Sequence, residues 1–286
     1  MKYSVSSYSY SGLVSSGEYT ELGLIALAKE MGFDGIEFAE IHPEEGYTKL
    51  QWAEKLGKEA EKYELEIPAY SIGADFLKDL DGEIERLKGE IDVCKALGCR
   101  LMRHDATSGY AKETRDQRGF NNALPVIIKG YKAVTEYAKT QGIRTAIENH
   151  GYFCQDCARV EAIINGVQDK NFGALVDIGN FLCADENPAV AVGNMAPYAF
   201  HVHCKDFHFK AGTELVPPDG FFMTRGGNFL RGAIIGHGVV PVKQCLKILK
   251  NAGYNGYLTV EFEGMEYPKT GVACGLNTLK KAEELI

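Results

Sequence analysis

The chain has 286 residues, of which 45% are hydrophobic and 24% are charged, the proportions of an ordinary globular protein. Its 31 basic and 39 acidic side chains give a formal net charge of −8. No cluster of Lys and Arg forms the positive stripe that nucleic-acid binding requires, so we expect no nucleic-acid partner. No apolar run approaches the ~18 residues of a membrane span, so we expect no membrane partner.

The eight cysteines are dispersed along the chain and are not concentrated in a short secreted framework. Residues 1–6 (MKYSVS) lack the apolar core of a signal peptide. These two features predict a reduced, cytoplasmic protein. Cys154 and Cys157 form one C-x-x-C pair, but neither a second pair nor a histidine follows, so we expect no metal or redox site there.

One local pattern recurs along the chain: the last turn of a predicted helix, a glycine, and then a short apolar strand. Clear examples surround Gly32, Gly98, Gly142 and Gly253. Glycine at this place suits the left-handed conformation that commonly ends a helix. The spacings fit a repeated strand–helix unit, which produces parallel strands joined by helical crossovers.

Eight such strands favour a single α/β domain over residues 1–286, a (β/α)8 TIM barrel, because these barrels usually have about 250 residues. An open doubly wound sheet is the alternative. It usually carries a glycine-rich phosphate turn after its first strand, and residues 6–12 do not match one. The predicted strands occupy residues 3–8, 33–38, 65–71, 99–104, 143–148, 172–177, 199–205 and 257–262.

The longest irregular stretch, residues 207–239, follows the seventh predicted strand and is rich in Gly, Pro and Phe. Loops longer than about 15 residues are usually functional or disordered. Because this loop leaves the carboxyl end of a barrel strand, where active sites lie, we interpret it as a lid.

Polar side chains follow most of the predicted strands at their carboxyl ends. Carboxylates placed after apolar runs, such as Glu148 after residues 145–147, would be costly to bury singly. Four such positions converging on one barrel mouth indicate a bound cation. Two Glu, one Asp and one His suit Mn²⁺ or Mg²⁺, with Co²⁺ and Zn²⁺ as alternatives. The polar residues at these ends are Glu37, Arg103, His104, Asp105, Glu148, Asn149, His150, Asp177, Asn180, His201, His203, Lys205, Asp206, Glu261 and Glu263.

Side-chain alternation does not separate the members of two pairs of candidate ligands. Glu261 and Glu263 point to the same side, so both remain open as ligands, and Glu261 is preferred because it still belongs to the predicted strand. His201 and His203 also share one face. His203 lies nearer the end of its strand and is the better candidate ligand.

Four segments resemble the xylose-isomerase-like barrels, a superfamily that includes sugar-phosphate isomerases and epimerases, ketose 3-epimerases, inosose dehydratases and endonuclease IV. The resemblance covers nearly the whole chain. The segments are Glu148 after Ile147, DIGN at 177–180, HVHCKD at 201–206, and GYNG at 253–256 leading to Glu261.

The resemblance implies a divalent metal, with Mn²⁺ expected first, and a small sugar or cyclitol as substrate. The implied reaction is isomerisation or epimerisation by proton abstraction next to a carbonyl, through an enediolate that the metal stabilises. Many relatives are dimers or tetramers, which suggests a homo-oligomer. By this resemblance the metal ligands are Glu148, Asp177, His203 and Glu261, with Glu148 and Glu261 also acting as acid and base.

The match departs from ketose 3-epimerases at three positions. Cys154, Asn180 and Phe209 stand where those enzymes carry a Glu, a His and an Arg. One alternative function is therefore a lyase acting on a keto-sugar or keto-inositol, with His150 as its catalytic base. A non-catalytic barrel subunit is a second alternative. Endonuclease IV is disfavoured, because residues 69–72 supply no histidine and the net charge is wrong for DNA.

Other polar residues near the predicted barrel mouth are candidates for substrate binding. Lys205 and Arg225 could hold a phosphate or neutralise the acidic rim, and without a paired basic clamp an unphosphorylated substrate is favoured. Glu37 would also fit a structural salt bridge to Arg103 or Lys205. The substrate-binding candidates are His104, Asn180, Lys205, His237, Arg225 and Glu37.

Overall fold

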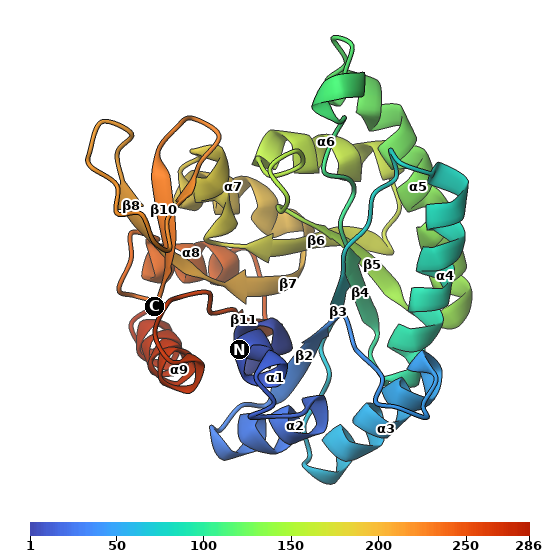
Figure 1. Cartoon of the computed structure of the whole chain (residues 1–286), viewed down its shortest axis with the longest axis vertical. Helices are drawn as coiled ribbons and strands as arrows, with labels where there is room; N and C mark the ends of the chain where they lie inside the picture. Colours follow the sequence, from blue (N-terminus) through green and yellow to red (C-terminus); the bar gives the residue numbers. More distant parts are fainter.

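The computed structural model describes residues 1–286, apart from the side chain of Thr114. Eight parallel strands form a closed barrel that the helices surround (Figure 1). The strand order is β1-β11-β7-β6-β5-β4-β3-β2, and β1 pairs with both β11 and β2 to close the barrel. The predicted (β/α)8 barrel is therefore confirmed, and the open doubly wound sheet is wrong.

The elements follow one another as alternating strands and helices around this barrel. The barrel strands are β1 (Lys2–Ser6), β2 (Gly35–Ala39), β3 (Tyr70–Ile72), β4 (Leu101–His104), β5 (Arg144–Glu148), β6 (Phe172–Asp177), β7 (Ala199–Cys204) and β11 (Tyr257–Val260). The helices are η1 (Ser7–Tyr10), α1 (Ser11–Ser15), α2 (Glu21–Glu30), α3 (Lys49–Lys62), α4 (Leu80–Ala96), η2 (Lys112–Thr114), α5 (Phe120–Gln141), α6 (Cys157–Val167), η3 (Asn180–Ala184), α7 (Pro188–Met195), η4 (Ala196–Tyr198), α8 (Val242–Asn251) and α9 (Pro268–Glu284).

The recurring glycines end their helices as predicted. Gly32, Gly98, Gly142 and Gly253 all have positive φ, between 71° and 87°. This left-handed conformation strains residues with a side chain, which is why glycine stands at these four helix ends. One predicted strand, 65–71, is shorter than expected and begins only at residue 70. The ring of Pro68 explains the delay, because proline has no N–H to donate to the neighbouring strand.

Residues 206–233 are only partly irregular, which corrects the expectation of a long loop without strands. They contain β8 (Asp206–Lys210), β9 (Phe222–Met223) and β10 (Phe229–Ala233), which form an antiparallel sheet in the order β8-β10-β9. Leu230 is fully buried, and the Phe207 and Phe222 rings pack edge to face at 5.7 Å. The role of this segment as a lid stays a prediction.

The barrel interior changes character along its axis. Ala69, Leu101, Ala146 and Leu175 form a small apolar cluster in the barrel. Two residues further along β5 and β6, alternation places Glu148 and Asp177 on the same inward face. Among the described helices, none combines the length and apolar character needed to cross a membrane.

Candidate metal centre

Three carboxylates and one imidazole meet at the carboxyl end of the barrel. Glu148 ends β5, Asp177 ends β6, His203 lies on β7, and Glu261 directly follows β11. One potential ligand atom from each lies within 4.8 Å of the others, and all four residues are buried. The structure therefore brings together the four residues to which the sequence resemblance assigned the metal.

The order of the strands places the two glutamates on opposite sides of this group. β7 and β6 lie between β11 and β5, so Glu148 and Glu261 flank Asp177 and His203. His203 Nδ1 lies 3.7 Å from Glu148 Oε1 and 3.4 Å from Glu261 Oε1. Glu261 lies one residue beyond its strand, but its N–H still donates to the Cys204 carbonyl at 3.0 Å.

Two buried cations offset part of the negative charge. Arg103 Nε lies 2.7 Å from Glu148 Oε2. Lys205 Nζ lies 2.6 Å from Glu261 Oε2 and 3.4 Å from Asp177 Oδ2. Lys205 also pairs with Glu263 at 2.9 Å, and Glu263 lies outside the four-residue group. The structure thus places Glu261, rather than Glu263, among the candidate ligands.

The electrostatics of the four residues fit a divalent cation. Burial raises the pKa of Asp177 to about 6, and the charges of Glu148 and Glu261 add to the rise against the opposing charge of Lys205. Asp177 Oδ2 and His203 Nδ1 are buried without a hydrogen-bond partner. Such atoms are costly in a protein interior, and a metal ion would satisfy both. These oxygen and imidazole donors suit Mn²⁺, Mg²⁺, Co²⁺ or Zn²⁺.

A cavity of about 270 Å³ opens above this group. Three of the four candidate ligands line it, as does Lys205, one of the predicted substrate-binding residues. Asn180 is buried beside it and donates from Nδ2 to Glu148 Oε1 at 3.1 Å. The lining residues are Tyr8, Ala39, Glu40, Ser71, Ile72, Gly73, Arg103, Asp105, Glu148, His150, His203, Lys205, Glu261 and Glu263.

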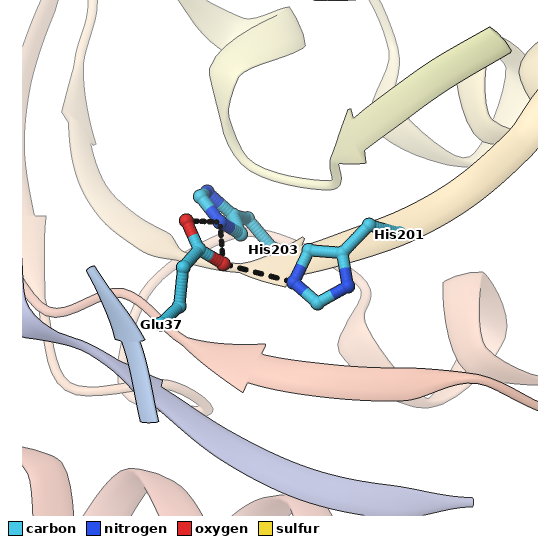
Figure 2. A group of neighbouring side chains, drawn as sticks. All are labelled: Glu37, His201 and His203. Atoms are coloured by element: carbon cyan, nitrogen blue, oxygen red, sulfur yellow. Dashed lines mark hydrogen bonds and ion pairs between the residues drawn. The ribbon is translucent and has the colours of Figure 1, made fainter. Parts of the chain in front are cut away.

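Glu37 lies beneath the candidate ligands and does not line the cavity. Its carboxylate is fully buried and contacts His201 and His203 from β7 (Figure 2). Burial opposes its ionisation, but the two histidines lower the pKa of Glu37 well below its usual range. The prediction of a salt bridge from Glu37 to Arg103 or Lys205 is wrong, because those two cations pair with other carboxylates.

His104 points away from the barrel interior, because its neighbour Arg103 points into it and side chains alternate along β4. Its ring stacks on Tyr131 with 4.5 Å between centroids, and its Nδ1 lies 2.8 Å from the Asp105 carbonyl oxygen. Burial lowers the pKa of His104 to about 4. The structure therefore places His104 in the packing between β4 and α5.

Two other predicted substrate-binding residues lie outside the cavity lining. Arg225 contacts Asp156 at 2.7 Å and the Tyr152 carbonyl oxygen. His237 is exposed on the segment that follows β10. Both belong to the region after β7, whose path the sequence pattern did not reveal.

His150 lines the cavity and is paired with Asp105, which sequence reasoning did not assign to the site. His150 Nδ1 lies 2.9 Å from Asp105 Oδ1, and Arg103 Nη2 donates to the same oxygen at 2.7 Å. Burial works against the charged imidazole, but the hydrogen bond and charge of Asp105 raise the pKa of His150. The signal for Asp105 was its place directly after the fourth predicted strand, two residues beyond Arg103.

A second cavity, of about 690 Å³, adjoins the first. Both are lined by Gly73, Asp105 and His150, so this histidine stands at their junction. Six of the nine other residues that line the larger cavity have polar side chains. Its other lining residues are Ala74, Asp75, Lys78, Asp79, Gly82, Glu83, Thr107, Ser108 and Gly151.

Fold and site together define a (β/α)8 barrel with a candidate divalent-metal centre at the carboxyl ends of its strands. Residues 25–282 match the family model of the xylose isomerase-like TIM barrel. The chain belongs to the xylose isomerase-like TIM barrel family, which confirms the resemblance seen in its sequence motifs.

Individual relatives are distant. The inosose dehydratase of Mesomycoplasma hyopneumoniae strain J is 23% identical over 255 residues, covering 82% of this chain and 78% of that protein. The L-ribulose-5-phosphate 3-epimerase of Salmonella heidelberg is 22% identical over 264 residues, covering 87% and 85%. A solved structure of the IolI protein with a bound zinc atom is 19% identical, with a TM-score of 0.73 and coverage of 99% of this chain and 96% of that one. At these identities the structural likeness establishes the fold.

Proposed function

We propose that this protein is a metal-dependent isomerase or epimerase that moves a proton next to the carbonyl of a small sugar or cyclitol. The main support for this proposal is that Glu148 and Glu261 lie on opposite sides of Asp177 and His203 and line one cavity. A divalent ion held there, Mn²⁺ first, would polarise the substrate carbonyl and acidify the adjacent C–H. The L-ribulose-5-phosphate 3-epimerase relative supports this reaction, and the zinc-bound IolI structure supports a bound metal. The inosose dehydratase relative supports the lyase described below, because a dehydratase removes water.

The side chains divide the proton transfer between them. One glutamate takes the proton from the carbon next to the carbonyl, and the other returns a proton to the opposite face or to the neighbouring carbon. Lys205 Nζ, which lines the cavity, can donate to a substrate oxygen that gains negative charge. Arg103 and Lys205 are both already paired with carboxylates, which favours a substrate without a phosphate group.

Deuterium wash-in tests this proposal. Protein loaded with Mn²⁺ is incubated in D₂O with a panel of keto-sugars and inososes, and mass spectrometry should detect one exchanged C–H in a product of otherwise unchanged mass. Glu148→Gln and Glu261→Gln should each abolish the exchange while circular dichroism shows an intact fold. The matched control is Glu90→Gln, a buried glutamate paired with Lys49 and Tyr70 outside the site. Full exchange by either glutamine variant contradicts the two-carboxylate scheme.

The His150–Asp105 pair favours a second candidate function, a lyase on a keto-sugar or keto-inositol. His150 stands where the two cavities meet. A substrate with its sugar ring in the smaller cavity and a second group in the larger cavity would have the bond between these two parts beside His150. As base, His150 would take the proton next to the carbonyl. The released electron pair forms a C=C bond, and the β C–O bond breaks, so that the leaving group departs with its electrons and takes up a proton.

Product mass distinguishes the two functions. Loss of water or of a larger leaving group identifies the lyase, whereas an unchanged mass identifies the isomerase. Only the lyase requires His150, so His150→Ala should then reduce turnover by about 100-fold or more, the usual contribution of a general base. His42→Ala, at an exposed histidine, is the matched control. Full turnover by His150→Ala would contradict the lyase.

A further inference from the structure

The centre of the barrel contains a buried carboxylate that the proposed reaction does not use. Glu37 Oε1 and Oε2 each lie 2.9 Å from His203 Nε2, and Oε2 lies 2.9 Å from His201 Nε2 (Figure 2). Ser71 Oγ donates to Glu37 Oε1 at 2.7 Å. Glu37 is wholly inaccessible to solvent, so its charge depends on these partners.

A second layer of hydrogen bonds holds this arrangement in place. His201 Nε2 also lies 2.7 Å from Thr259 Oγ1, which lies 2.6 Å from Ser4 Oγ. The network therefore joins β1, β2, β3, β7 and β11 across the interior of the barrel. Such a connected set of buried polar groups restricts the rotation of each member.

The two nitrogens of the His203 ring face different surroundings. Nε2 faces the carboxylate of Glu37, whereas Nδ1 faces Glu148 and Glu261 and has no hydrogen-bond partner. A carboxylate only accepts hydrogen bonds, so the proton of a neutral His203 belongs on Nε2. The lone pair of Nδ1 is then directed toward Glu148 and Glu261, the two glutamates of the candidate metal site.

We propose that Glu37 is a positioning residue for the metal centre: it accepts the Nε2 proton of His203 and fixes the ring so that Nδ1 is the ligand atom. His201 and Ser71 in turn hold the Glu37 carboxylate. The inference rests on the proposed function for the metal, and goes beyond it by assigning the supporting residues. Loss of a carboxylate that supports a ligating histidine typically weakens metal affinity by about 10–100-fold.

Two measurements on the full chain test the proposal. Isothermal titration calorimetry of chelator-treated protein with Mn²⁺ should give a Kd about 10–100-fold weaker for Glu37→Gln than for wild type. Glu90→Gln, the buried control outside the site, should bind like wild type. Thermal unfolding verifies that both variants are folded. Equal affinity in wild type and folded Glu37→Gln contradicts this inference alone, whereas a wild type that binds no Mn²⁺ contradicts the proposed metal centre and this inference with it.

The second measurement uses the wild-type protein, so it does not depend on whether a variant folds. Histidine ¹⁵N NMR of the zinc-loaded wild type should show His203 with a metal-bound Nδ1 and a protonated Nε2. Coordination through Nε2 would overturn the proposal. A metal stoichiometry of two ions per chain would also overturn it, because Glu37, His201 and His203 would then form a metal site of their own.

Discussion

The ammonium group of Lys205 lies 2.6 Å from the carboxylate of Glu261, one of the four proposed metal ligands. Both side chains are buried, so solvent does little to weaken the attraction between their charges. A lysine of the protein thus compensates the acidic group when no metal is bound, and a bound metal would take over part of that role.

Lys205→Met should destabilise the metal-free protein by about 3–5 kcal/mol, the usual cost of leaving one partner of a buried ion pair alone. Saturating Mn²⁺ should restore more unfolding free energy in this variant than it adds to wild type. Urea unfolding with and without Mn²⁺ measures both quantities. Lys210→Met is the control, because its ion pair with Glu214 is partly exposed and should contribute less than about 1 kcal/mol. Equal stabilisation of wild type and Lys205→Met by Mn²⁺ would argue against the shared role.

Part of the loss of stability in acid should come from Asp105. Burial alone would raise the pKa of Asp105, but the charge of Arg103, with His150 and His104, lowers it to about 2. A lowered pKa stabilises the folded state above the unfolded value of about 3.9, and this contribution is lost as the pH falls through the folded value. From pH 5 to pH 3, wild type should therefore lose on the order of 1 kcal/mol more unfolding free energy than Asp105→Asn.

Urea unfolding at the two pH values measures this difference. Asp219→Asn, at an exposed aspartate, is the control. The same loss of stability in Asp105→Asn and wild type would show that Asp105 ionises normally in the folded protein.

The carboxylate of Asp206 holds the segment after β7 through backbone hydrogen bonds. The buried Asp206 carboxylate accepts backbone N–H groups from Phe207, Gly236, Gly238 and Val240, at 2.8–3.0 Å. Asp206→Ala should cost about 2–4 kcal/mol in urea unfolding, since several donors lose their acceptor. Asp206→Asn, which keeps one oxygen, should cost less. Stability of Asp206→Ala within about 0.5 kcal/mol of Asp219→Asn would mean that water replaces the carboxylate.

The barrel could be predicted because its signals are local. Each helix-ending glycine is needed at its own position, and strand ends place Glu148 and Asp177 by simple alternation. The environment of Glu37 could not be predicted, because β2 and β7 are far apart in the chain and meet only across the closed barrel. Likewise, the sequence does not show which of the adjacent residues Arg103 and His104 faces the barrel interior, so the outward direction of His104 could not be predicted. Within the sheet after β7, β9 was missed because it has only two residues, too few to show alternation.

The central claim is that Glu148, Asp177, His203 and Glu261 bind one divalent ion. Isothermal titration calorimetry with Mn²⁺ on chelator-treated protein tests it directly, with Asp177→Asn as the disabling variant and Glu90→Gln as the folded control. We expect one ion per chain for wild type and Glu90→Gln. Asp177→Asn should bind Mn²⁺ about 100-fold or more weakly, because the substitution removes the charge of a direct ligand. Absence of binding by wild type, or equal binding by Asp177→Asn, would contradict it.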